Sequence, residues 1–224
     1  SNDSSDFSLT VTATASDDRS SASSVQTLAV TVDGVADTPT LSTSAGSGNE
    51  DSAIALSISS DLADSSESLS VVISGVPTGA SLSAGTDNGD GSWTLTSAQL
   101  SGLSVTPPSN DSSNFQLTVT ATATDGSSTA QSVDTLDVAV AGVADSPNLS
   151  TSAASGNEDS AISLSISSSL ADSSESLSVV ISGVPTGGSL SAGTDNGDGS
   201  WTLTSAQLSN LTITPPSDDA SNFS

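Results

Sequence analysis

Hydrophobic residues alternate with small or polar residues along most of the chain. Runs with this alternation lie at 54–58, 69–73, 93–95, 103–105, 115–123 and 136–140. A period of two places successive side chains on opposite faces of a β-strand, so each run predicts a strand with one buried and one solvated face. Clusters of Gly, Pro, Asn and Asp separate the runs and predict turns. No segment of comparable length shows the periodicity of a helix.

The chain repeats itself at a fixed offset of 108 residues. Residues 1–116 align without a gap onto 109–224, and roughly four in five aligned positions are identical. The segment Ser-Leu-Ser-Val-Val-Ile-Ser-Gly-Val-Pro-Thr-Gly, for example, occurs at 68–79 and again at 176–187. A period of this length corresponds to a whole small domain and not to one turn of a solenoid.

About seven short strands per repeat predict an all-β fold, an antiparallel β-sandwich of immunoglobulin-like type. The segments Gly-Val-Ala-Asp-Thr-Pro (34–39) and Gly-Val-Ala-Asp-Ser-Pro (142–147) are the expected linkers, because a proline cannot donate a hydrogen bond to a sheet. The sequence then divides into the last strands of one module (1–37), a complete module (38–145) and the first strands of a third (146–224).

The incomplete modules at the two ends allow two interpretations. The chain is either a window on a longer array of modules in one polypeptide, or a subunit whose tail is completed by the head of another copy. The second interpretation predicts an extracellular filament that assembles by strand complementation, because unpaired strand edges invite pairing with another chain.

Composition excludes several functional classes. The chain has 26 acidic residues, one cation (Arg19) and no His or Cys, and its formal net charge is -25. Binding to nucleic acid or to an anionic membrane surface needs positive charge and is not expected. Without His or Cys, a catalytic triad, a thiol nucleophile and a zinc ribbon are also ruled out, and we expect no enzymatic activity. No apolar stretch is long enough to cross a membrane.

The carboxylates instead suggest calcium, which takes six to eight oxygen ligands. The complete module holds twelve acidic residues and no cation, so divalent ions would relieve its repulsion. Some acids are lost between the repeats, as Asp61 is at Ser169, and these are expected on the solvated surface. Others recur in every copy: Asp3, Asp111 and Asp219; Asp17 and Asp125; Asp37 and Asp145; Glu50 and Glu158; Asp51 and Asp159.

Several of the recurring acids lie near the boundary between two modules in the sequence. Asp125 follows a long strand, Asp145 lies in the linker, and Glu158 with Asp159 opens the next module. We therefore expect these residues to converge on the junction between modules and to bind calcium. The alternative is an acidic rim that binds no ion.

Two other acidic segments have local interpretations. Asp-Asn-Gly-Asp-Gly (87–91) lacks the spacing of an EF-hand loop and is predicted to form a tight β-hairpin turn. Asp64 and Glu67, with their counterparts Asp172 and Glu175, lie in a polar loop and are weaker candidates for a peripheral ion site.

The segments 117–126 and 136–147 resemble the end of a cadherin-like repeat. In that family a strand ending in Ala-x-Asp, an acidic linker before a proline and a Glu early in the next domain share calcium ions. Carried over by position, the resemblance implicates Asp125, Asp145 and Glu158, with Asp111 near the family's acidic loop. At the other junction it implicates Asp17, Asp37, Glu50 and Asp3. The single linker Asp departs from the family, whose linkers carry several ligands.

The richness in Ser, Thr and Asp, the absence of Cys and the near-identical modules also resemble the extender region of giant type I-secreted (RTX) bacterial adhesins. That resemblance implies a calcium-stiffened spacer on a bacterial cell surface, outside the cell. Its direct partners would be neighbouring repeats of the same chain.

Overall fold

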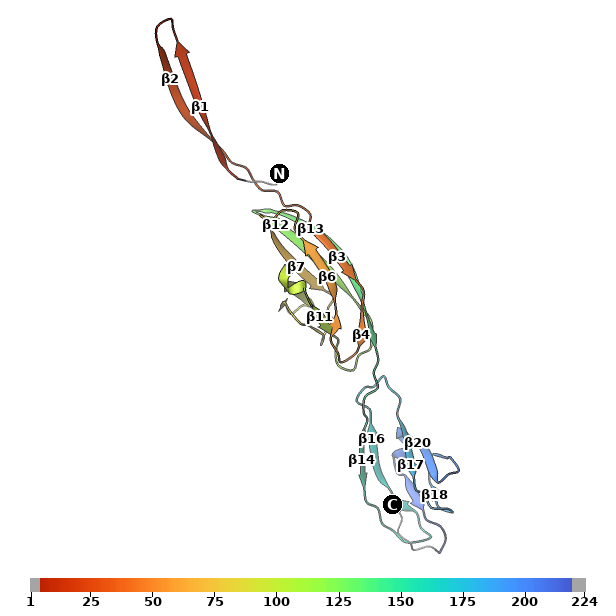
Figure 1. Ribbon diagram of the computed structural model, residues 1–224. Coiled ribbons are helices and arrows are strands. Elements are labelled where there is room, and N and C mark those ends of the chain that lie inside the picture. The colour runs from red at the N-terminus through yellow and green to blue at the C-terminus, as the bar shows by residue number, and fades with distance from the viewer. Residues whose placement is uncertain (1–4, 219–224) are drawn as a thin grey trace. The chain divides into compact units, whose positions relative to one another are not determined.

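The structure is a computed structural model that describes residues 5–218 (Figure 1). It divides into two compact units, 1–141 and 142–224, which are described separately below. Unit 1 contains a two-stranded hairpin and a complete β-sandwich, and unit 2 contains part of a second sandwich. The all-β fold predicted from the alternating pattern is therefore confirmed. No helix among residues 5–218 is long and apolar enough to span a membrane.

The first hairpin consists of β1 (Phe7–Ser16) and β2 (Ser21–Val30). Its strands pair antiparallel with Phe7 opposite Val30 and Ser16 opposite Ser21. Within the described residues this hairpin pairs with no other strand, so it forms a sheet of its own.

The complete sandwich occupies the rest of unit 1. Its elements are β3 (Thr40–Ser44), β4 (Gly46–Asn49), β5 (Ile54–Ala55), β6 (Ser57–Asp61), β7 (Ser68–Ser74), β8 (Ser81–Leu82), β9 (Thr86–Asp87), β10 (Ser92–Leu95), the 3-10 turn η1 (Ser97–Leu100), β11 (Ser104–Thr106), β12 (Phe115–Asp125) and β13 (Ser128–Ala141).

Two layers of strands enclose the core of this sandwich. One layer is a six-stranded sheet in the order β4-β13-β12-β7-β10-β9, and the other comprises the small sheets β3-β6 and β5-β11-β8. All pairs are antiparallel except β4 with β13, which run parallel. A first strand that splits between the two layers and joins the last strand in parallel gives an immunoglobulin-like arrangement.

The core is built from the apolar positions that the alternation selected. Leu117, Val119 and Ala121 on β12 are fully buried, and Val119 and Ala121 lie opposite the buried Ile73 and Val71 of the neighbouring strand β7. Burial alternates strictly along β12 and along the second half of β13. One side of the sheet therefore faces the core and the other faces solvent, as expected for an antiparallel layer.

The predicted turn at 87–91 is confirmed as a hairpin. Asp87 pairs with Trp93 across it, and Gly89 and Gly91 both have positive φ. Asp87 accepts a hydrogen bond from the backbone N–H of Gly89 at 2.8 Å, and Asp90 accepts one from Ser92 at 3.0 Å. These carboxylates cap the turn, so they have a structural role of the kind common for Asp in turns.

Unit 2 repeats the first part of the same sandwich. Its elements are β14 (Asn148–Ser152), β15 (Ile162–Ser163), β16 (Ser165–Ser169), β17 (Ser178–Ser182), β18 (Ser189–Leu190), β19 (Thr194–Asp195), β20 (Ser200–Thr204), the 3-10 turn η2 (Ser205–Leu208) and β21 (Thr212–Thr214). They form the sheets β14-β16, β15-β21-β18 and β17-β20-β19.

Both expected linkers contact the module that follows them. Asp37 of the first linker bonds to a residue of the complete module, and Asp145 of the second bonds to a residue of unit 2, as described below. Residues 142–145 belong to unit 2.

Candidate metal-binding carboxylates

The linker before the complete module is held by a buried glutamate. Glu67 is only 7 % exposed, and its Oε1 accepts a hydrogen bond from the backbone N–H of Asp37 at 2.6 Å. The loop before β7 positions this side chain, because Asp64 accepts from the N–H of Ser66 at 3.0 Å and its carbonyl accepts from the N–H of Glu67 at 3.3 Å. A residue that sequence alone placed in a peripheral loop thus anchors the linker.

The same linker makes three further contacts. They involve the end of β12 and the first residues of β13. Ala36 donates its N–H to Ser128 Oγ at 3.0 Å, and the carbonyl of Pro39 accepts from Ser132 Oγ at 2.6 Å. Gly34 lies so close to the carboxylate of Asp125 that a Cβ at this position would collide with it. Asp37, Glu67 and Asp125 therefore all lie at the end of the module where the linker enters.

Unit 2 repeats the central contact. The N–H of Asp145 donates to Oε1 of Glu175 at 2.6 Å, and the repeat offset of 108 makes this the counterpart of the Asp37–Glu67 bond. Asp172, the counterpart of Asp64, is 3 % exposed and accepts from the N–H of Ser174 at 2.7 Å. The same residues therefore dock the linker in both units.

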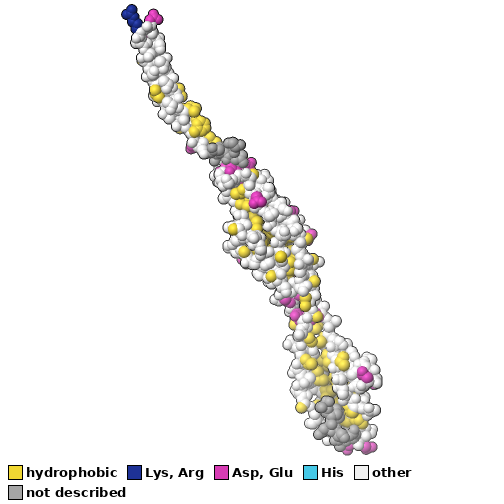
Figure 2. Space-filling view, viewed as in Figure 1, with side chains coloured by type: hydrophobic (Ala, Val, Ile, Leu, Met, Phe, Trp, Pro, Cys, Tyr) yellow, Lys and Arg dark blue, Asp and Glu magenta, His cyan; other side chains and the backbone are white. Residues whose placement is uncertain are grey.

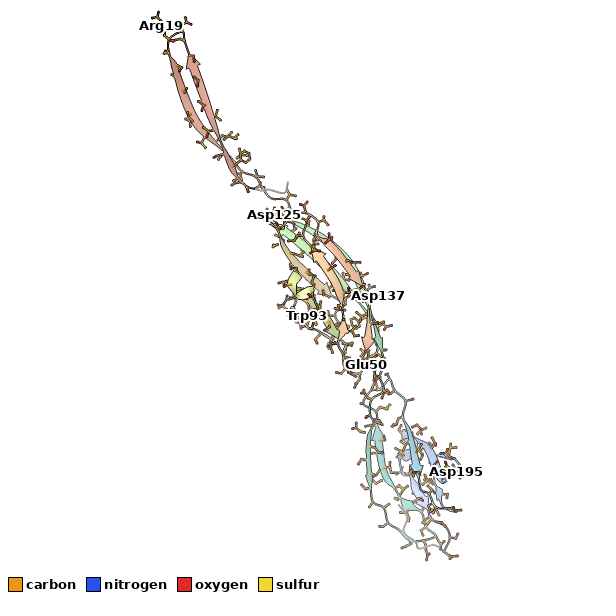
Figure 3. The ribbon with its side chains drawn as sticks, in the orientation of Figure 1. Arg19, Glu50, Trp93, Asp125, Asp137 and Asp195 are labelled. Carbon is orange, nitrogen blue, oxygen red and sulfur yellow. The ribbon has the colours of Figure 1, made fainter. Side chains whose placement is uncertain are left out.

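A second group of acids lies at the opposite end of the complete module. Glu50 is 2 % exposed, and its N–H donates to the carbonyl of Ala141, the last residue of β13, at 3.0 Å. Asp51 Oδ1 accepts from the N–H of Asn110 at 3.0 Å, next to Asp111. Figure 3 labels Asp125 and Glu50 at the two ends of this module.

Asp125 was expected to share one junction with Asp145 and Glu158, but within unit 1 it lies at the end of the module opposite to Ala141, after which the chain leads to those two residues. Asp125 precedes the turn that reverses the chain from β12 into β13, so it lies where the module begins. The fourteen residues of β13 then carry the chain back to Ala141, a distance of about 45 Å at ~3.4 Å per residue. Glu158 is exposed in unit 2 and, like its counterpart Glu50, lies beyond the first strand of its module.

The remaining predicted ligands have separate surroundings. Asp17 is at the turn of the first hairpin, where its Oδ1 accepts from Arg19 N–H at 2.9 Å and from Ser20 N–H at 2.8 Å. Asp159 Oδ1 accepts from the N–H of Asp218 at 3.2 Å, which reproduces the Asp51–Asn110 contact in unit 2. Asp3 and Asp219 lie outside the described residues.

The nine predicted residues that lie within 5–218 do not form a closed cluster of ligands. Among residues 5–218, no three acidic side chains come together in a group that could hold a metal ion by themselves. Oε2 of Glu67 and Oδ2 of Asp145 are buried and accept no hydrogen bond within this part of the chain. Glu67 holds the first linker and Asp145 lies in the second. Each linker contact therefore contains one such oxygen, and a buried anionic oxygen without a partner is costly.

Each of these oxygens could accept a cation at its own linker. Calcium accepts backbone carbonyls and water beside carboxylates, so a linker site needs fewer acidic side chains than a closed cage. Glu67 was predicted only as a weaker candidate for a peripheral ion site, because it lies in a loop whose sequence shows no periodicity. The sequence signal available was that Glu67 directly precedes the alternating run at 69–73, so it lies at the end of a predicted strand.

Hydrogen bonds lower the pKa values of several carboxyls. The hydroxyl of Ser113 and then its backbone N–H hold the pKa of Asp111 below its usual range. The pKa of Asp17 is lowered mainly by the backbone N–H groups of Arg19 and Ser20. In Asp134 the main cause is the hydroxyl of Thr43, which donates to Oδ2 at 2.8 Å. These groups are thus held in the anionic form.

We expect Thr43→Val to raise the pKa of Asp134 toward its ordinary value, because the substitution removes the main donor to the anion. A depressed pKa in the folded state adds stability above the unfolded value, and that stability is lost as the pH falls through the folded pKa. The variant should therefore be less stable to unfolding than the wild type at neutral pH, and the two stabilities should converge in strong acid. An NMR titration of carboxyl carbons measures the shift, with Asp111 as the group that should not move. An unchanged Asp134 would contradict the assignment.

No protein-family profile matches the chain, and no curated protein is similar to it. Among solved structures, it is similar to a chimeric titin Z1Z2 functionalized with a KLER exogenous peptide from decorin, at 14 % sequence identity and a TM-score of 0.27. The match covers 78 % of this chain and 87 % of that one. At that level of likeness, the immunoglobulin-like assignment rests on the strand order described above.

Proposed function

We propose that the chain is a stretch of calcium-stiffened spacer modules from an extracellular bacterial adhesin, without catalytic activity. Tandem immunoglobulin-like β-domains indicate a structural, modular role. The observation that carries the proposal further is the repeated contact between a linker N–H and a buried glutamate, Asp37 to Glu67 and Asp145 to Glu175. A spacer transmits orientation only if each linker is fixed to a module, and this contact fixes it.

Calcium would add to this contact where the protein leaves negative charge uncompensated. Bound calcium would supply positive charge to Glu67 Oε2 at the first linker and to Asp145 Oδ2 at the second, and both oxygens are buried and accept no hydrogen bond within the described residues. Glu67 orients the linker through Oε1 and would hold a bound ion through Oε2. Because a ligand that binds only the folded state stabilises it, ion binding would stiffen the linker and raise the stability of its module.

An extracellular location follows from the same argument. Millimolar calcium outside the cell would saturate weak sites that remain empty in the cytoplasm, so the modules would stiffen after secretion. The composition supports the absence of catalysis, since the chain has no His, Cys or Lys to act as a base or nucleophile.

Calorimetry of the 224-residue chain with millimolar calcium and with a chelator tests the proposal. At about ten times the dissociation constant, binding adds about 1.4 kcal/mol, which corresponds to a rise in Tm of about 5–10 °C for a domain of this size. We expect Glu67→Gln to remove most of the rise for the complete module, because it keeps the shape of the side chain and removes the charge.

The matched control is Asp61→Asn, which removes the same charge from an exposed residue whose counterpart is Ser169. It should leave the calcium response unchanged. Equal losses in both variants would indicate a diffuse acidic surface and not a linker site. If calcium does not change the Tm of the wild type, calcium has no part in the function.

A further inference from the structure

The hairpin β1–β2 exposes a face that is buried in the complete module. Leu9 and Val11 are 46 % and 52 % exposed, whereas their counterparts Leu117 and Val119 are each 0 % exposed. Figure 2 shows hydrophobic side chains on the surface of this hairpin. A hairpin with an open apolar face and free edges is at best marginally stable by itself, so this surface is suited to a partner.

The hairpin already has the geometry of the last hairpin of a module. Thr10 lies opposite Thr27 in β1–β2, as Thr118 lies opposite Thr135 in β12–β13. The flanking contact is also repeated, since Asp6 Oδ1 accepts from Val32 N–H at 3.0 Å and Asn114 Oδ1 accepts from Val140 N–H at 2.8 Å. The Asp6–Val32 bond flanks the hairpin β1–β2, and the Asn114–Val140 bond flanks β12–β13 of the sandwich. The hairpin therefore needs no change of register to act as a final hairpin.

Unit 2 exposes the complementary surface. In the complete module β7 lies between β10 and β12, but its counterpart β17 pairs with β20 alone among the described strands. Val71 and Ile73 are fully buried in the complete module, and the corresponding Val179 and Ile181 are only partly buried. The core of unit 2 is correspondingly small. Its open edge and open core lie where a final hairpin would fit.

We propose that the 224-residue chain binds a second copy of itself head to tail, with β1–β2 of one copy completing unit 2 of the next. The complete module supplies the register, because β12 pairs antiparallel with β7 from Thr118 opposite Ser74 to Thr124 opposite Ser68. Shifted by the repeat, Val11 of one copy lies opposite Ile181 of the other, and Ala13 lies opposite Val179.

A second pairing accompanies the first. In the complete module the parallel partner of β13 is β4, with Val138 opposite Gly46. The corresponding segment of unit 2, residues 154–157, forms no strand. On assembly it should become a strand alongside β2 of the incoming copy, with Ala154 opposite Val30. Formation of this strand distinguishes completion of the sandwich from nonspecific apolar contact.

The strands that would pair carry no charges that would repel a second copy. Within 7–30 the acidic residues are Asp17 and Asp18 at the turn, next to Arg19, and the strands are neutral. β17 is also neutral, with the sequence Ser-Val-Val-Ile-Ser. If further modules flank these residues in a longer chain, they would cover the same two surfaces within that chain. In the 224-residue polypeptide, the matching surface is that of another copy.

Sedimentation velocity across a range of protein concentrations tests the association, and a chelator in the buffer separates it from the calcium proposal. We expect oligomers that grow with concentration and are not limited to dimers, because head-to-tail contacts leave both ends open. Val11→Asp should weaken the association about 100-fold or more, since assembly would bury an unpaired charge. Val11 is exposed in the free hairpin, so the complete module should unfold as in the wild type.

Gln26→Asp is the matched control. It introduces the same charge into the same hairpin, at a position where the other repeat already has an acid, Asp134. It should leave the association nearly unchanged. Hydrogen exchange should then show protection appearing at 154–157 and 178–182 only in the assembled state.

The proposal is overturned if the wild type stays monomeric at several hundred micromolar, or if both variants weaken the association equally. Association without new protection at 154–157 would also overturn it, because the sandwich would not have been completed. A monomer with protected β1 and β17 would mean that the chain completes itself, which excludes the second copy as partner.

Discussion

Replacing Leu117 by alanine is expected to destabilise the complete module by about 2–5 kcal/mol, the usual range for a buried leucine that leaves a cavity. Leu117 is fully buried near the start of β12, where it lies opposite Leu136 and belongs to the same core cluster. The module has few aromatic side chains to fill space, since aromatics are 2 % of the chain. A loss of 3 kcal/mol corresponds to a fall in Tm of about 12–24 °C for a domain of this size.

The repeat provides a control for this substitution. Leu9 is the same residue in the same sequence context, but it is 46 % exposed in the free hairpin. Leu9→Ala should therefore change the unfolding free energy of the complete module by less than about 0.5 kcal/mol. Both variants are compared by urea unfolding at a protein concentration where the chain is monomeric. Equal effects would mean that the hairpin is buried under these conditions.

Replacing Gly85 by alanine is expected to cost about 2–4 kcal/mol, for two separate reasons. Gly85 has a φ of +100°, which is unfavourable for a residue with a Cβ. The new Cβ would also lie 2.8 Å from Cγ of the buried Leu95 and 3.0 Å from the carbonyl oxygen of Thr94. Neither neighbour can move freely, because Leu95 is in the core and Thr94 is paired in the sheet.

Gly102→Ala separates the two contributions. Gly102 also has a positive φ, of +72°, but no atom lies within 4 Å of a Cβ placed there. This substitution should therefore cost only about 1 kcal/mol, the part that comes from the backbone. The repeat agrees with this difference, because position 102 is replaced by Asn210 with a φ of +58°, whereas Gly85 is again glycine at Gly193. Similar costs for both variants, measured by urea unfolding, would show that the contact with Leu95 is relieved without penalty.

A small number of hydrogen bonds attach each linker to the module that follows it. In unit 1 the linker is held by Glu67, Ser128 and Ser132, which come from a loop and from the last strand of the following module. In unit 2 the contact to Glu175 is present without the two serine contacts, whose counterparts lie in the final hairpin of a module. Completion of unit 2 by a hairpin should therefore also add linker contacts there.

The sequence by itself indicated the strands that carry most of the core, their buried faces and the tight turn at 87–91, but not the short strands β3, β4, β8 and β9. Alternation with a period of two is a local property, and it selected Leu117, Val119 and Ala121 as core residues correctly. The repeat of 108 residues also showed that the hairpin and unit 2 are parts of one type of module. These features depend on neighbouring residues and on comparison within the chain, so no tertiary information was needed.

Only the tertiary structure decided where the acidic residues lie. Asp125 and Glu50 are at opposite ends of the module because β12 and β13 are antiparallel, whereas β4 runs parallel to β13 and ends beside Ala141. Glu67 reaches Asp37, thirty residues away in sequence, because the loop before β7 is at the end where the linker enters. The order and direction of strands set these positions, and alternation along one strand carries no information about either.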